Sequence, residues 1–149
     1  PKLMKLAGER FDGAFSYLQT LAYSKIAKGL LGEGRLNLMQ PTVFLEDPEA
    51  ARSLARKAIK IYMPLEHYHR AWRERGFEDA DFKDGGSDAF IDALIPWGSS
   101  ATINAAYRQQ IAQGVGHIIM TPLGLDLDQD SGWQTISALI QSLKGSGAA

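Results

Sequence analysis

The densest group of residues with chemical potential is Glu66-His67-Tyr68-His69-Arg70, which is followed by Arg73 and Arg75. Two histidines spaced two positions apart on a helix point about 200° from each other, so they do not form the i, i+4 pair of a helical zinc site. We therefore expect no metal site here. The arginines make the segment basic, and Arg70 is a candidate to bind an anionic substrate or cofactor tail. The alternative is a solvated helix face on which Glu66 and Arg70 pair at i, i+4.

Other catalytic patterns are absent from the sequence. It contains no G-x-G-x-x-G, no Walker loop, no G-x-S-x-G elbow and no cysteine, which excludes thiolate nucleophiles and thiolate metal sites. The carboxylates of Asp126, Asp128 and Asp130 alternate as in a calcium loop, but the required glycine and closing glutamate do not follow. Trp72 and Trp97 have the spacing of core anchors.

Composition places the chain among ordinary globular domains. Of 149 residues, 45% are hydrophobic and 22% charged, which is enough for one hydrophobic core. The net charge is −1, so the chain has no overall positive field that would attract nucleic acid or an anionic membrane. No apolar stretch approaches the roughly 20 residues of a membrane helix. We expect a soluble, cytoplasmic protein with no nucleic-acid or membrane partner.

These residues must be positioned by alternating helices and strands. Pro1 opens a helical stretch, Asp47 and Pro48 open another, and Ser87 and Ser99 or Ser100 are N-cap candidates. The expected strands are 14–19, 35–45 and 115–120; the expected helices are 1–9, 21–34, 47–62, 65–77, 88–95, 101–113 and one from about 131, with 79–88 as a loop. Strands separated by helical crossovers indicate a parallel sheet in an α/β fold.

Two strands carry further signals. His117-Ile118-Ile119-Met120 is apolar on both sides, as expected for a central strand of a parallel sheet, and His117 at its start has the place of a structural residue. Pro41 cannot donate to a ladder and indicates a bulge or an edge position in its strand. Three strands are few, because a (β/α)₈ barrel takes about 250 residues.

Three stretches carry a family resemblance: PKLMKLAGERFDG, EDPEAARSLARKAIKIYMPLEHYHRAWRERGFEDADF and GGSDAFIDALIPWGSSATINAAYRQQIAQGVGHIIMTPL. In this order and at this spacing, they resemble the C-terminal half of luciferase-like flavin- or coenzyme F420-dependent oxidoreductases. The resemblance implies a partial (β/α)₈ TIM barrel made of its last three parallel strands. Residues 1–144 would be the C-terminal half of that barrel and residues 145–149 a flexible tail.

The resemblance also implies a site. The helix resembling PKLMKLAGE follows the loop near the cofactor phosphate, so Pro1, Lys2 and Leu3 are expected at the edge of the cofactor site, although a helix start with a solvated lysine is the simpler interpretation. Ligands of TIM barrels lie at the carboxyl ends of the strands. Tyr17 and Thr121 are accordingly expected to bind substrate together with Arg70, although Thr121, as the strand-ending residue before a proline, needs no such role.

The implied activity is hydride transfer or monooxygenation of a small organic substrate with coenzyme F420 or FMN, in the intact parent protein. The resemblance names no catalytic residue in this chain. Three parallel strands leave open sheet edges and an apolar face, so we expect a homo-oligomer or a fragment that lacks its N-terminal half. The alternative is a non-catalytic half-barrel that acts as an oligomerising or binding module. An α/β protein unrelated to oxidoreductases is a third possibility.

Overall fold

The structure is a computed structural model that describes residues 2–144. The predicted tail, 145–149, and Pro1 lie outside these residues. The elements are α1 (Lys2–Arg10), β1 (Gly13–Tyr17), α2 (Tyr23–Leu31), β2 (Arg35–Val43), α3 (Pro48–Ile59), α4 (Glu66–Arg73), the 3₁₀ helix η1 (Asp79–Gly85), α5 (Asp88–Leu94), α6 (Ser100–Ala112), β3 (Val115–Leu123) and α7 (Asp130–Lys144). Within 2–144 no helix is long and apolar enough to cross a membrane.

The three strands form one parallel sheet in the order β1-β2-β3. The expectation of parallel strands joined by helical crossovers is confirmed. The expectation that β3 is a central strand is wrong, because β2 is the central strand and β3 lies at an edge. The apolar residues of β3 do face two sides, but only one side is covered by other described residues.

Pro41 lies in β2 beyond the end of β1 and is paired only with Thr121 of β3, so it has an edge position, which is one of the two predicted alternatives, and not a bulge. The register shift in this pair of strands falls between Leu36 and Asn37 instead. The position tolerates proline because β1 ends opposite Met39, so β2 has only one neighbouring strand at Pro41.

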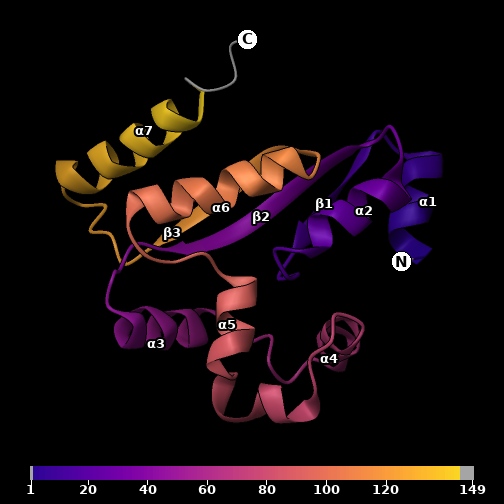
Figure 1. The fold of residues 1–149 in the computed structure, drawn as a ribbon, viewed down its shortest axis with the longest axis horizontal. Coiled ribbons are helices and arrows are strands. Elements are labelled where there is room, and N and C mark those ends of the chain that lie inside the picture. Colours follow the sequence, from indigo (N-terminus) through magenta and orange to yellow (C-terminus); the bar gives the residue numbers. More distant parts are fainter. Residues whose placement is uncertain (1, 145–149) are drawn as a thin grey trace.

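Helices cover one face of the sheet (Figure 1). Side chains of α2 pack on Leu36 and Leu38, and side chains of α6 and α7 pack on Ile118 and Met120. This packing forms two hydrophobic clusters that hold the helices against β2 and β3.

The opposite face of the sheet is bare over much of its length. Phe15, Met39 and Ile119 come from the three strands and share this face by register, and 65%, 41% and 36% of their surfaces are exposed. His117 and Thr121 of β3 lie on the same face and are exposed too. We call Phe15, Met39 and Ile119 the bare sheet face.

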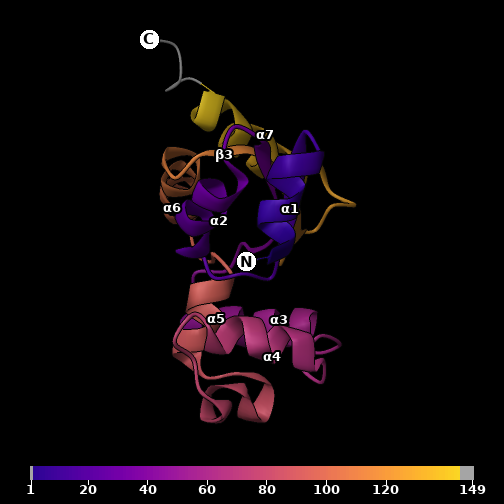
Figure 2. The same cartoon turned by 90° about the vertical axis from the view of Figure 1, so that its right-hand side faces the viewer.

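The segment from α3 to α5 forms a separate layer at the carboxyl ends of β1 and β2. Figures 1 and 2 show α3, α4 and α5 gathered below the sheet and its helices. Its core includes the fully buried Trp72, Phe90 and Ile91, which pack with Leu18 and Val43 from the strand ends. The predicted role of Trp72 as a core anchor is confirmed, and Trp97 packs half-buried against the same core.

Sequence signals explain most element boundaries. The side chains of Asp47, Ser87 and Ser99 each accept a hydrogen bond from the first turn of the following helix, as N-caps do. The expected loop at 79–88 contains the 3₁₀ helix η1, which begins at a capping box formed by Glu78 and Asp81.

Candidate functional site

Hydrogen bonds join the carboxyl ends of β1 and β2 to the α3–α5 layer and to the loop that follows it. The indole nitrogen of Trp72 donates to the carbonyl of Leu18 at 2.8 Å, and the amide of Leu21 donates to the carbonyl of Ala93 at 2.8 Å. Val43 forms an isolated parallel bridge with Trp97. The loops that follow the strands are therefore fixed by the inserted helices.

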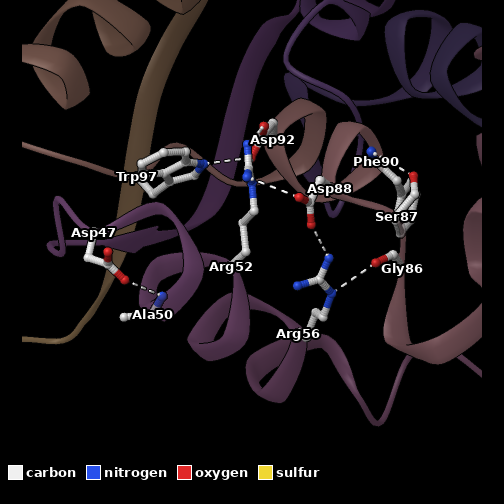
Figure 3. A network of polar contacts seen from close by, with 10 residues as sticks. All are labelled: Asp47, Ala50, Arg52, Arg56, Gly86, Ser87, Asp88, Phe90, Asp92 and Trp97. Atoms are coloured by element: carbon white, nitrogen blue, oxygen red, sulfur yellow. Dashed lines mark hydrogen bonds and ion pairs between the residues drawn. The ribbon is translucent and has the colours of Figure 1, made fainter.

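A polar network joins α3 to α5 beside these loops (Figure 3). Arg52 binds Asp92 through two nitrogens, at 2.9 Å and 2.6 Å, and also reaches Asp88 at 3.0 Å. The Oδ1 atom of Asp92, which accepts from Arg52 Nε, also accepts from the indole nitrogen of Trp97 at 2.7 Å. Burial is the largest single effect on Asp92 and opposes ionisation, but the bonds from Arg52 and Trp97 together hold its pKa below the usual range.

The same network extends to the start of α5. Arg56 binds Asp88 at 2.5 Å and the carbonyl of Gly86 at 2.9 Å. Ser87, which caps α5, also donates to Asp81 at 2.7 Å. The two arginines of α3 thus fix the position and direction of α5, which carries Asp92.

A hollow of about 490 Å³ lies beside Trp97 and is lined by residues at the start of α6 and in the loop that precedes α6. Its wall is apolar at Leu21, Ile95 and Ala106 and polar at Glu46 and Asp92. The network of Arg52 and Asp92 therefore holds one wall of this hollow.

Tyr17 ends β1 in a row of aromatic rings. Its ring meets Tyr62 edge-on at 5.3 Å, and Tyr62 meets Tyr68 in the same way at 5.6 Å. Burial raises the pKa of the Tyr17 hydroxyl, and a hydrogen bond and the charge of Tyr62 raise it further. Tyr17 is neutral at physiological pH, so it can act as a hydrogen-bond donor and not as an anion.

The predicted site residues are only partly assembled. Tyr17 and Thr121 share the uncovered side of the sheet, but they lie on its two outer strands with β2 between them. Arg70 is exposed on α4 and comes from the α3–α5 layer rather than from a strand of the sheet. Lys2 and Leu3 open α1 and are exposed, while Pro1 lies outside the described residues.

The ion pairs of the basic helix differ from the expected ones. The predicted Glu66–Arg70 pair is wrong, because Glu66 binds Arg73 at 2.7 Å, and Arg73 also binds Asp79 at 2.7 Å. The Asp79 carboxylate of η1 draws Arg73 toward Glu66, which the helix spacing alone does not reveal. His69 packs on Trp72 and Phe82, and residues 2–144 hold no group of three or more metal-ligating side chains.

No pattern in the sequence indicates the most unusual feature, which is the turn after β1. Leu18 is 3% exposed and has a φ of 49°, a left-handed conformation that is rare for leucine. The next residue, Gln19, has a side-chain oxygen that is shielded from solvent and finds no hydrogen-bond partner among the described residues. The hollow that Gln19 lines together with Ser24 and Gln110 has a volume of only about 10 Å³, so this oxygen is enclosed by the chain itself.

Comparison with known proteins supports the fold. No family model matches the sequence, and no curated protein matches it closely. A similar solved structure is an F420-dependent secondary alcohol dehydrogenase in complex with an F420–acetone adduct, at 13% sequence identity and a TM-score of 0.66. The match covers 96% of this chain and 46% of that chain, so the chain spans about half the length of its neighbour. The fold is α/β and matches part of a TIM-barrel-like architecture.

Proposed function

We propose that this chain is the C-terminal half of an oxidoreductase barrel that uses coenzyme F420 and acts on a small organic substrate. The observation that carries the proposal is the match of 96% of the chain to an F420-dependent secondary alcohol dehydrogenase. Because the sequence identity is low, the match supports the fold alone. The proposed cofactor and reaction therefore also depend on the residues of the site.

The strand ends carry groups that fit such a cofactor. Tyr17 offers a neutral hydroxyl and Thr121 an exposed hydroxyl. F420 or FMN, when bound, supplies the hydride chemistry, and the protein supplies binding and orientation. Lys2 and Leu3 at the start of α1 are proposed to border the cofactor site. Arg70 is proposed as a further substrate contact, which requires α4 to approach the bound substrate.

The bare sheet face supports the second part of the proposal. The outer edges of β1 and β3 have no neighbouring strand among the described residues, and an eight-stranded barrel needs five strands besides these three. We propose that the remaining strands belong to an N-terminal half that covers the bare sheet face. A second copy of this chain is the alternative occupant.

A titration tests the cofactor. F420 fluorescence, followed as protein is added, should be quenched at saturable concentrations, and FMN serves as the comparison. Stronger binding of FMN would reassign the cofactor, and absence of saturable binding of either would contradict the proposal. A Thr121→Val variant, which keeps the shape of the side chain and loses the hydroxyl, should weaken binding if Thr121 faces the ligand.

A further inference from the structure

The outer edge of β3 has backbone groups that can pair with another strand. The amide of Phe44, just after β2, donates to the carbonyl of Leu123 at 2.9 Å, so the backbone groups of Leu123 point toward β2. Successive residues of a strand direct these groups to alternate sides, and the pairing of β3 with β2 is regular from His117 to Leu123. The backbone groups of Ile118 and Met120 therefore point to the outer edge, where no described strand lies.

Pro122 limits the part of this edge that can bind a strand. By the same alternation its nitrogen faces outward, and a proline nitrogen has no hydrogen to donate. Proline on an edge strand interrupts pairing in natural sheets. A further strand can therefore pair with Ile118 and Met120, and its regular pairing ends at Pro122.

An apolar hollow of about 680 Å³ lies next to this edge. Its lining includes Ile118 and Met120 of β3, Ile111 of α6, and Trp133 and Ile140 of α7. The last three side chains are 49%, 55% and 43% exposed. Apolar side chains that entered the hollow would cover this surface, which is favourable because it removes apolar area from water.

The place of α7 in the chain explains the hollow. After β1, the helix α2 packs on Leu36 and Leu38 of the next strand, β2. In a parallel sheet, a helix that follows one strand covers the strand that comes next. The helix α7 follows β3 and packs on α6 through Leu139, but the described residues contain no strand on the outer side of β3. The hollow is therefore the place of a missing strand.

The β1 strand of a second copy would fill the hollow poorly. The β1 residues on the helix-covered face are Ala14 and Ser16, which pair with Leu36 and Leu38, and both have small side chains. The matched F420-dependent structure offers more chain, because the match covers only 46% of it. The remaining length is enough for a strand with larger side chains.

We propose that the outer edge of β3 binds a strand of the proposed N-terminal half, and that every second side chain of this strand is large and apolar and fills the hollow beside α7. The strand pairs with Ile118 and Met120, and its pairing ends at Pro122. The inference rests on the proposed function for the N-terminal half itself. The open edge and the hollow rest only on the register and packing of this chain.

The first experiment measures hydrogen exchange of single amides by NMR. The probe is a nine-residue peptide that alternates threonine and valine, because β3 has nine residues. At about 90% saturation, the amides of Ile118 and Met120 should exchange roughly tenfold more slowly. The amides of Ile119 and Thr121 point toward β2 and are internal controls, so their exchange should not change.

A second peptide of the same composition, with the order Thr-Thr-Val-Val repeated, lacks the alternation and should give no protection. Absence of protection by the alternating peptide would overturn the proposal. Equal protection by the second peptide would overturn the role of the hollow. Protection that rises with the concentration of the chain alone would assign the edge to a second copy, and would overturn the proposal too.

The second experiment tests the hollow. Ile140→Glu places a carboxylate among its apolar side chains and should weaken binding of the alternating peptide by roughly tenfold or more, with an unchanged circular dichroism spectrum. Ile26→Glu is the matched control, since Ile26 is an isoleucine of α2 that is 53% exposed and does not line the hollow. Equal affinity of the two variants for the peptide would overturn the role of the hollow.

The F420 titration keeps the two proposals apart. If the chain binds the peptide and not F420, the proposed cofactor fails and the strand site stands. If the chain binds F420 and the peptide gives no protection, the strand site alone fails.

Discussion

At the scale of single residues, Asp92 links the stability of the protein to pH. Its pKa is depressed in the folded protein, so the stability that it contributes is present above the pKa of an unfolded aspartate, about 3.9, and is lost as the pH falls through the folded value. Below about pH 4, we expect the urea concentration at the midpoint of unfolding to decrease, and to decrease less steeply in Asp92→Asn. Urea unfolding between acidic and neutral pH measures both.

The control for this prediction is Asp126→Asn, since Asp126 is exposed and far from the arginines of α3 in sequence. Its pH profile should match that of the wild-type protein. An equally steep loss of stability at low pH in Asp92→Asn would show that the Arg52–Asp92 pair is not the source.

Tyr107 is a second residue whose polar contact is buried in the covered face of the sheet. Its hydroxyl lies 2.5 Å from that of Thr42, and burial raises the pKa of Tyr107 to about 12 although the bond to Thr42 opposes the shift. Tyr107→Phe should lower the free energy of unfolding by about 1–2 kcal/mol, because Thr42 loses a partner in the core.

The sign of the pH effect gives a further check on the same variant. A raised folded pKa means that the contribution of neutral Tyr107 is present below pH about 10 and is lost as the pH rises toward the folded value. Tyr107→Phe should not show this alkaline component. Tyr68→Phe is the control for the loss of stability at neutral pH, because burial also raises the pKa of the half-buried Tyr68 but no hydrogen bond contributes to the shift. An equal loss in the free energy of unfolding at neutral pH in Tyr68→Phe would contradict the role of the buried bond.

At the scale of elements, α1 depends on one close approach to α2. A Cβ atom on Gly8 would stand 2.4 Å from the backbone carbonyl oxygen of Leu31, a distance that real Cβ atoms do not adopt. Gly8→Ala should therefore destabilise the protein by about 1–3 kcal/mol, as overpacking does. Gly29→Ala within α2 meets no atom within 4 Å and should stabilise by about 0.5–1 kcal/mol.

Thermal or urea unfolding of the two variants separates packing from helix propensity. Both changes add one methyl group to a helical glycine, so helix propensity alone predicts that both variants gain stability. A gain in Gly8→Ala would show that α1 is not seated against α2.

Local signals predicted these elements well, for a physical reason. Asp47, Ser87 and Ser99 each cap a helix through a bond spanning three residues, which the sequence displays directly. The alternation in strands and the helical spacing between them are equally local, and they indicated a parallel sheet.

Long-range contacts escaped the same reasoning. Glu66 binds Arg73 and not Arg70 because Asp79 of η1 also attracts Arg73, and the pair is decided outside α4. Leu18, whose φ is 49°, accepts a hydrogen bond from Trp72, a residue 54 positions away along the chain. The edge position of β3 depends on which strands pair with it, and the amino-acid composition of β3 does not encode this pairing.

At the scale of the whole molecule, we expect the bare sheet face to determine whether the chain is a monomer or associates with another chain. Phe15 and Ile119 stand on the outer strands β1 and β3, and the open edges of these strands have backbone groups that can pair with another strand. An apolar face with two open edges favours association with another chain. The purified chain alone should therefore elute with a mass above 16.3 kDa, the mass of a single copy.

Charge on this face should prevent the association without unfolding the chain. Phe15→Lys and Ile119→Lys each place a cation where a second sheet would pack, so light scattering during size-exclusion chromatography should show a shift toward 16.3 kDa with an unchanged circular dichroism spectrum. Ile26→Lys is the control, since Ile26 is 53% exposed on α2, away from the bare sheet face, and should leave the mass unchanged. A wild-type chain that is a stable monomer would contradict association through this face, and a monomer produced equally by Ile26→Lys would place the contact on the helices instead.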